Sequence, residues 1–200
     1  METLQEYLER LSSHEPTPGG GSAAALVAAL GAALCEMAGR IADVPPDLLS
    51  RAQRLRADAL AARERDERAF AAVIAAQALP KSNDAEKAAR RDALETALHG
   101  AAAEPLHAAS IALDVLRLSR ELAQMHTGAL ASDIGCAAEF AAASLAACAY
   151  NVRINHRYMK DEAAIRAQSA TLEPYENEAA RIVHDVRGLL AQGRLAQGDK

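Results

Sequence analysis

The sequence predicts an all-α protein, an antiparallel bundle of six or seven helices, and three observations support this. Half of the 200 residues are hydrophobic but only 3 % are aromatic, so the core must be built from small side chains on closely approaching helices. Apolar residues recur at helical spacing, whereas the alternation and turn dipeptides of β-hairpins are missing. The connections are short, which favours antiparallel neighbours. We expect a single domain over residues 1–200.

The first half of the chain predicts three helices. Residues 3–12 carry apolar side chains on one face, and after a proline- and glycine-rich loop Ser22 is a good N-cap for a second helix to about Ala42. Pro45 and Pro46 end that helix. A long amphipathic helix then follows from Asp47 to Leu79, and Pro80 stops it.

The second half predicts three or four more helices. The first covers residues 85–103, and Pro105 either opens a new helix or kinks the old one into a segment ending near Met125. Ser132 caps a nearly uncharged helix to about residue 159, which other helices must surround. The last helix covers residues 161–192 with an interruption at Pro174, and residues 193–200 are expected to fray.

Composition excludes several classes of function. The net charge of −5 and pI near 5.7 argue against binding to nucleic acid or an anionic membrane surface. Three cysteines without a C-x-x-C pair predict neither disulfides nor structural zinc. The acidic N-terminus does not resemble a signal peptide, and the uncharged stretch of residues 16–35 leaves about 14 helical residues where a bilayer needs about 20. We therefore expect a cytoplasmic protein.

The loop of residues 16–22, Pro-Thr-Pro-Gly-Gly-Gly-Ser, is the first candidate for a binding site. Its glycines permit positive φ and close approach of a ligand, and the free N–H groups of the helix that follows favour an anion or a polar ligand edge. A simple turn between two helices is the alternative. The six histidines are scattered, without the i, i+4 pairing of a helical metal site, so we expect no metal.

Two carboxylates stand out by their surroundings. Asp133 begins the apolar helix, and Asp66 lies where a charged helical face gives way to an apolar one. Taken alone, Asp133 could be a residue favoured by the helix dipole, and Asp66 could be an ion-pair partner of neighbouring arginines.

Taken together, six blocks in order resemble the cyclodeaminase domain of formiminotransferase-cyclodeaminase and its stand-alone relatives that act as methenyltetrahydrofolate cyclohydrolases. The blocks extend over most of the chain: residues 11–26 (LSSHEPTPGGGSAAAL), 66–70 (DERAF), 79–81 (LPK) with 86–90 (EKAAR), 103–106 (AEPL), 132–135 (SDIG) and 151–155 (NVRIN). This resemblance implies an all-helical homodimer with a folate-binding groove near the subunit interface.

The resemblance also implies one of two reactions. One converts formiminotetrahydrofolate to methenyltetrahydrofolate with release of ammonia, which we expect slightly more, and the other is the methenyltetrahydrofolate cyclohydrolase reaction. Neither needs a cofactor beyond the tetrahydrofolate derivative that is the substrate. Asp133 and Asp66 match family elements and are the expected catalytic pair, one as electrostatic stabiliser and the other as proton shuttle.

The expected substrate-binding residues follow from the same blocks. The glycine loop would meet the pterin edge or the folate carboxylates, basic side chains would bind the anionic glutamate tail, and two asparagines would bind the pterin or join helices. These residues are Pro18, Gly19, Gly20, Gly21, Ser22, Ser132, Lys81, Lys87, Arg90, Arg153, Asn151 and Asn155.

Two segments depart from the family pattern. Residues 39–47 lack the usual lysine-rich stretch ending in tyrosine, and residues 126–131 lack the usual asparagines. These departures leave open a third possibility, a non-catalytic folate-binding or structural homologue.

Overall fold

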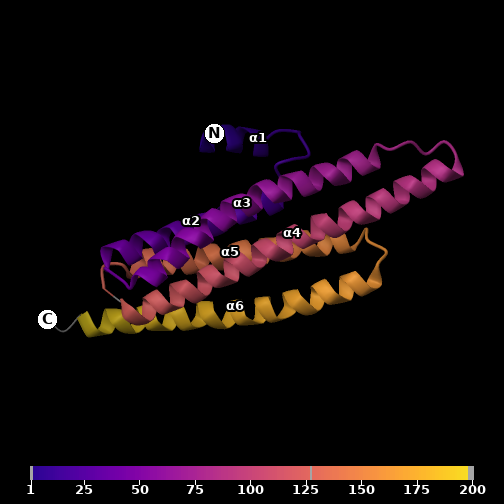
Figure 1. Ribbon diagram of the computed structural model, residues 1–200. Coiled ribbons are helices and arrows are strands. Elements are labelled where there is room, and N and C mark those ends of the chain that lie inside the picture. The colour runs from indigo at the N-terminus through magenta and orange to yellow at the C-terminus, as the bar shows by residue number, and fades with distance from the viewer. Residues whose placement is uncertain (1, 127, 198–200) are drawn as a thin grey trace.

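A computed structural model of the chain describes residues 2–126 and 128–197, with side chains to residue 192. The described part contains six helices and no strand, which confirms the all-α prediction. Five helices form an elongated bundle, and the short first helix stands to one side of it (Figure 1). The helices are α1 (Leu4–Leu11), α2 (Gly20–Ile41), α3 (Pro46–Gln77), α4 (Asp84–Met125), α5 (Ala131–His156) and α6 (Glu162–Gln197).

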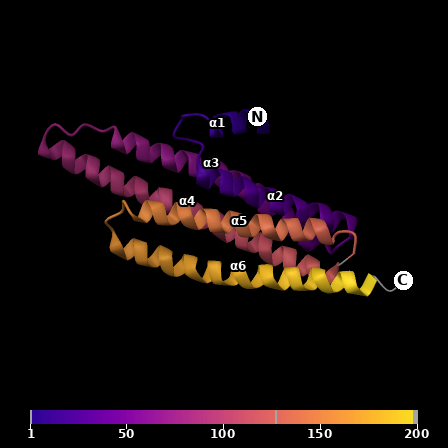
Figure 2. The ribbon, with the colours of Figure 1, turned by 180° about the vertical axis from the view of Figure 1, so that it is seen from behind.

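Small residues let α2 and α5 pack closely and antiparallel, side by side in the view from behind (Figure 2). The Ser144 hydroxyl on α5 donates a 2.7 Å hydrogen bond to the Ala24 carbonyl on α2. A Cβ on Gly31 would lie only 3.0 Å from the Ala137 carbonyl oxygen, so glycine permits this approach. The same pairing brings the start of α2 to the end of α5.

The core is built largely from alanine, with a few larger side chains on α4, α5 and α6. Leu113, Leu116, Ile134, Leu145 and Ile182 are among the largest side chains that are fully buried. A second, smaller cluster around Val73, Leu98 and Met159 lies where α3, α4 and the α5–α6 connection meet. It supports the end of the bundle at which α3 and α4 are joined.

Both prolines expected to break helices lie inside continuous ones. Pro105 lies within the 42 residues of α4, so it does not open a new helix. Pro174 lies within the 36 residues of α6, so the interruption expected there is wrong, and the described chain has six helices. Pro105 has no N–H to donate to the Ala101 carbonyl, and the Asn155 side chain supplies a donor there at 2.8 Å. Residues 193–197 continue α6, residues 198–200 lie outside the described part, and the expectation of a frayed tail stays a prediction.

The two expected serine caps are also corrected. Helix α2 begins at Gly20 with Gly19 as its N-cap, and α5 begins at Ala131 with Leu130 as its N-cap, so Ser22 and Ser132 lie in first turns. Helix α2 is therefore longer than expected. Its 22 residues are long and apolar enough to span a bilayer, and 61 % of the most apolar window is buried within the bundle.

Candidate active site

The start of α2 lies against side chains from α3 and α5, and its glycines make this possible. A Cβ on Gly20 would lie 3.3 Å from the Asn151 side-chain nitrogen, and a Cβ on Gly21 would collide with the Asp66 carboxylate. No described glycine has a positive φ, so these two glycines serve close approach rather than an unusual backbone conformation. No side chain caps the helix, and N–H groups of its first turn have no intrahelical acceptor.

Pro18, Gly19 and Ser22 complete this junction. Pro18 is buried and follows a cis peptide bond, Gly19 is half-buried, and Ser22 is fully buried. The Ser22 hydroxyl donates to Glu67 Oε1 at 3.0 Å and is 2.9 Å from the Tyr7 hydroxyl. The predicted loop residues thus lie together in one place.

Asp66 on α3 is the side chain of this site that is best suited to acid–base chemistry. Burial raises its pKa to about 6, and the negative charges of Glu104 and Glu67 act in the same direction. A hydrogen bond from the Ser22 backbone N–H opposes them. A carboxyl group with a pKa near neutrality can both accept and return a proton under physiological conditions.

Glu104 on α4 is a second carboxylate of this site that the sequence analysis did not select. It accepts a 2.9 Å hydrogen bond from Arg65 Nε and lies close enough to Asp66 to raise the pKa of that carboxyl. The available sequence signal was its place in the block of residues 103–106, where it precedes Pro105. The site therefore holds a protonatable carboxyl beside an ion-paired one.

The two asparagines of α5 connect helices at this site. Asn151 lies against Gly20 and donates to the Ala147 carbonyl at 2.9 Å. Asn155 donates to the carbonyls of Ala101 and Asn151 at 2.8 and 2.9 Å. The amide nitrogen of Asn155 is thus used in joining α4 to α5, whereas Asn151 lies directly at the glycine junction.

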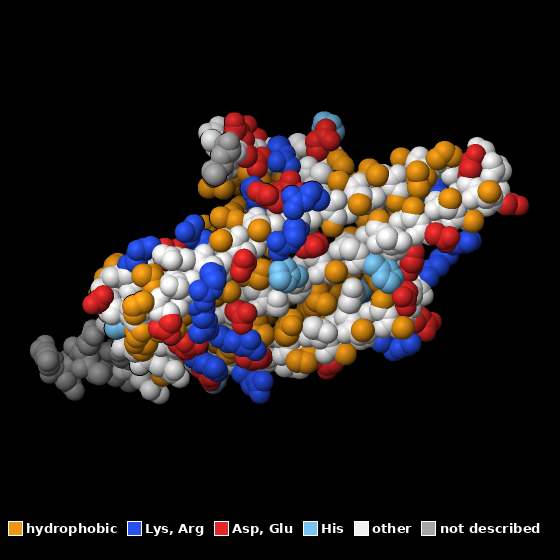
Figure 3. Space-filling view, viewed as in Figure 1, with side chains coloured by type: hydrophobic (Ala, Val, Ile, Leu, Met, Phe, Trp, Pro, Cys, Tyr) orange, Lys and Arg blue, Asp and Glu red, His pale blue; other side chains and the backbone are white. Residues whose placement is uncertain are grey.

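Three of the predicted basic residues share a groove near the α3–α4 connection. Lys81, Lys87 and Arg90 line a hollow of about 310 Å³ together with Arg91 and Lys160, which the sequence analysis did not select. Lys and Arg side chains also gather at this end of the molecule in the space-filling view (Figure 3). Arg90 lies about 16 Å along α4 from Ala101, the residue that Asn155 contacts, at 1.5 Å per residue.

The remaining predicted site residues, Arg153, Ser132 and Asp133, make no contact with the glycine junction that the structure shows. Arg153 forms a two-bond ion pair with Glu176 of α6, at 2.8 and 2.5 Å. Ser132 and Asp133 are in the first turn of α5, and Asp133 lies about 27 Å along the helix from Asn151 at 1.5 Å per residue. A single chain thus does not bring Asp133 to Asp66, and their joint role stays a prediction.

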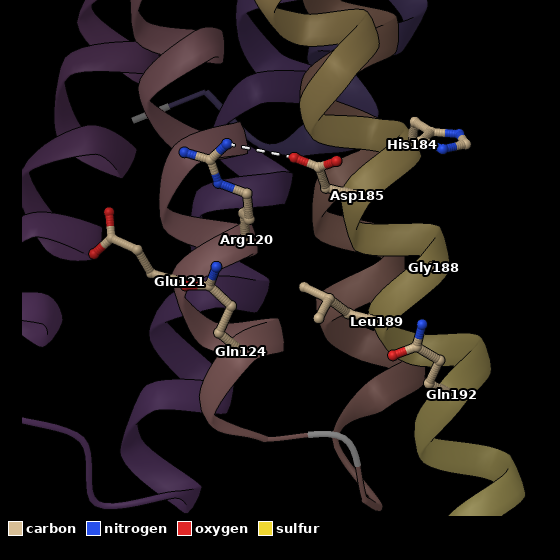
Figure 4. A pocket seen from close by; sticks show the side chains of 8 residues that line it. All are labelled: Arg120, Glu121, Gln124, His184, Asp185, Gly188, Leu189 and Gln192. Atoms are coloured by element: carbon tan, nitrogen blue, oxygen red, sulfur yellow. Dashed lines mark ion pairs between the residues drawn. The ribbon is translucent and has the colours of Figure 1, made fainter.

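A further hollow, of about 430 Å³, lies between α4 and α6 (Figure 4). Its charged side chains are paired with each other or with neighbours: Arg120 lies 3.5 Å from Asp185, and Glu121 lies 2.8 Å from Arg51. It contains none of the predicted site residues. The glycine junction therefore remains the candidate site.

The match to a known family covers most of the chain. The model of the family described as formiminotransferase-cyclodeaminase matches residues 3–174, which include the glycine junction, Asp66, Glu104 and both asparagines. The chain belongs to the formiminotransferase-cyclodeaminase family. The resemblance inferred from the sequence blocks is thereby confirmed.

Two kinds of curated relative match the chain in sequence. The chain is 35 % identical to a methenyltetrahydrofolate cyclohydrolase from Methylorubrum extorquens, over 90 % of this chain and 92 % of the relative. It is 32 % identical to the formimidoyltransferase-cyclodeaminase of Rattus norvegicus, over 80 % of this chain but only 31 % of that longer protein.

A solved structure shares the fold along the whole length. The formiminotetrahydrofolate cyclodeaminase from Thermotoga maritima superposes with a TM-score of 0.84, at 26 % identity and with 96 % of each chain covered. The two chains thus share one helical fold over nearly their full lengths.

Proposed function

We propose that this protein is an enzyme of folate-dependent one-carbon metabolism, with its site at the junction of Gly20, Gly21, Asp66, Glu104 and Asn151. The observation that carries the proposal is the position of Asp66 against the glycine turn, half-buried and with a pKa of about 6. Family membership supplies the class of substrate, a tetrahydrofolate that carries a one-carbon unit.

The cyclodeaminase reaction needs one proton acceptor that becomes a proton donor. The N10 amine of formiminotetrahydrofolate attacks the formimino carbon, and the Asp66 carboxylate takes the N10 proton as the tetrahedral carbon forms. Protonated Asp66 then returns the proton to the departing nitrogen, so that ammonia leaves and the methenyl cation remains. A second proton, taken up when the imine nitrogen is protonated before attack, balances the charge of the cation.

Glu104 suits the second requirement of this chemistry. The developing amidinium is cationic, and a nearby carboxylate in a site with little water stabilises it electrostatically. The ion pair with Arg65 holds Glu104 in place beside Asp66. Two carboxylates in different surroundings thus provide a proton shuttle and a fixed negative charge.

The cyclohydrolase reaction is the second candidate, and the cyclohydrolase relative that matches nearly the full length favours it. Here water adds to the methenyl carbon while Asp66 accepts one water proton. Protonated Asp66 then returns this proton to N5 as the C–N5 bond breaks, and the remaining hydroxyl proton is released to solvent as the carbonyl of 10-formyltetrahydrofolate forms. The same two carboxylates serve this reaction. We rank the two reactions equally.

The basic groove fits the anionic end of the substrate. Folates carry a glutamate with two carboxylates, and Lys81, Lys87 and Arg90 present positive charge toward the groove that they line. Arg91 and Lys160 extend this charge, so we include them in the proposed tail site.

We also propose a homodimer formed through the outer faces of α2 and α5. Leu30, Met37, Phe140, Tyr150 and Ile154 are exposed apolar side chains on these two adjacent helices. Exposed large apolar side chains on two helices that pack against each other favour an interaction surface there. Sedimentation velocity of the wild type and Leu30→Glu tests this: the proposal predicts dimer and monomer, respectively, and a monomeric wild type contradicts it.

The two reactions are tested with two substrates. The purified protein is incubated separately with formiminotetrahydrofolate and with methenyltetrahydrofolate, and the methenyl chromophore is followed. Formation from the first substrate assigns the cyclodeaminase, and loss of the second above the spontaneous rate assigns the cyclohydrolase. No acceleration of either, with folate binding retained in a calorimetric titration, would instead assign a non-catalytic folate-binding homologue.

A further inference from the structure

Helix α1 is tied to the candidate active site by a chain of side-chain hydrogen bonds. Tyr7 is the buried residue of α1, with 1 % of its surface exposed, and its hydroxyl lies 2.9 Å from the Ser22 hydroxyl. The single hydroxyl proton of Ser22 goes to Glu67 Oε1, at 3.0 Å. The Tyr7 hydroxyl must therefore be the donor to the Ser22 oxygen.

The other side-chain contacts of α1 also involve residues beside Ser22. Arg10 donates to Glu67 Oε2 at 2.6 Å, so that Glu67 is held by both α1 and α2. The Arg63 guanidinium lies 4.9 Å from the centroid of the Tyr7 ring and pairs with Glu2 at 3.4 Å. By contrast, Leu4 and Leu8 on the same helix are exposed. The contacts of α1 thus converge on the glycine junction.

These contacts bear on Asp66 through Ser22. Ser22 is fully buried in the first turn of α2, the turn against which the Asp66 carboxylate packs at Gly21, and its hydroxyl is held between Tyr7 and Glu67. Holding the hydroxyl anchors this first turn, and with it the N–H groups that the turn presents to Asp66.

We propose that Tyr7 is a positioning residue of this enzyme, whose hydroxyl holds Ser22 so that the Ser22 N–H stays aimed at the Asp66 carboxylate. This role rests on the proposed function only for its effect on turnover. The effect on Asp66 itself is a property of the free protein and can be measured without substrate.

Charged and titratable groups face Asp66 from five helices. Tyr7 comes from α1, the Ser22 N–H from α2, Glu67 from α3, Glu104 with its partner Arg65 from α3 and α4, and Cys148 from α5. Removing the Tyr7 hydroxyl changes no charge among these groups. Its effect on Asp66 must therefore pass through geometry.

The test is a titration of Asp66 by carbon NMR in protein labelled at the aspartate carboxyl groups, with Asp66→Asn to assign the signal. Tyr7→Phe keeps the ring and its packing against Arg63. It is expected to raise the pKa of Asp66 by about half a pH unit, because a loosened N–H stabilises the carboxylate less. Glu67→Gln removes a negative charge and is expected to move the pKa downward. Gln5→Ala, on the same helix and bonded to Glu9, is the matched control.

A double mutant decides whether Ser22 is the connection. Ser22→Ala is expected to raise the pKa of Asp66 as Tyr7→Phe does, and adding Tyr7→Phe to it is expected to change nothing further. In the enzymatic assay below pH 6, kcat of Tyr7→Phe is expected to fall about threefold with little change in KM, because half a pH unit changes the ionised fraction of Asp66 about threefold. The acidic limb of its pH–rate profile is expected to move with the pKa of Asp66.

An unchanged Asp66 titration in Tyr7→Phe, or additive effects of the two substitutions, overturns the proposal. A wild-type protein inactive on both folate substrates overturns the proposed function instead. The two failures are distinguishable because the NMR titration needs no substrate.

Discussion

At the scale of single residues, the missing side chain of Gly21 is what allows Asp66 to reach the start of α2. A Cβ at this position would occupy the space of the carboxylate. Gly21→Ala is therefore expected to displace Asp66 and to lower kcat/KM by at least about 100-fold, the size of a lost general-base contribution. Helix content by circular dichroism is expected to be unchanged.

Gly100→Ala is the matched control for this substitution. Gly100 lies exposed on α4, and nothing lies within 4 Å of the Cβ it would gain. Its activity is expected to equal that of the wild type. Equal activity of Gly21→Ala and Gly100→Ala would show that Asp66 is not part of the site.

Asp66 also makes stability depend on pH. Its pKa is raised from 3.8 to about 6 in the folded protein, so the folded state binds this proton more tightly than the unfolded chain does. The free energy of unfolding is thus reduced as pH rises from about 4 to above 6. Asp66→Asn removes this penalty and is expected to stabilise the protein by about 3 kcal/mol at pH 8.

Urea unfolding of the wild type and Asp66→Asn at pH 5 and pH 8 checks this expectation. The gain is expected to be larger at pH 8 than at pH 5, and Asp58→Asn, exposed on the same helix, is expected to give no such difference. A destabilised Asp66→Asn at pH 8 would contradict the raised pKa.

The sequence predicts some residues of the site but not the contacts between them. Glycine runs and serines mark the junction, but nothing in a one-dimensional pattern reports that Gly21 faces Asp66 across 45 positions. Glu104 was not predicted as a site residue, because its role depends on α4 passing beside α3. Asp133 was selected for its surroundings in sequence, and the fold then placed it at the other end of α5 from Asn151.

At the scale of elements, the continuity of α4 depends on a contact with another helix. Pro105 leaves the Ala101 carbonyl without its helical donor, and Asn155 of α5 replaces that donor. Asn155→Leu is expected to cost about 1–3 kcal/mol of stability, because it leaves this carbonyl unsatisfied. Thermal or urea unfolding measures the loss.

A double-mutant cycle isolates this interaction. Pro105→Ala restores the backbone N–H, so Asn155→Leu is expected to cost less in that background than in the wild type. Equal costs in both backgrounds would mean that Asn155 does not substitute for the missing helical hydrogen bond.

Helix periodicity located four of the six elements closely, because amphipathic patterns extend over many turns. The break at Pro174 and the new helix at Pro105 were wrong because proline propensity is local, whereas a neighbouring helix can satisfy the carbonyl that Pro105 leaves free. The N-caps were misplaced by three and two residues, since Gly19 and Leu130 cap their helices without a side-chain hydrogen bond.

At the scale of the whole molecule, the glycine junction and the basic groove occupy positions that one extended ligand can span. If the groove binds the folate tail, Lys81→Gln together with Lys87→Gln is expected to raise KM about tenfold and to leave kcat nearly unchanged. Arg166→Gln, whose side chain is exposed and pairs with Glu162, is the control. An unchanged KM would remove the groove from the substrate site.

The proposed function depends on proton transfer by Asp66 in folate one-carbon chemistry. The most direct test is the initial rate of methenyltetrahydrofolate formation or consumption, on whichever of the two folate substrates the wild type turns over, by Asp66→Asn beside Asp58→Asn. Asp66→Asn is expected to lose at least about 100-fold in kcat while remaining folded, and Asp58→Asn is expected to retain the wild-type rate. A folded Asp66→Asn variant with the wild-type rate would contradict it.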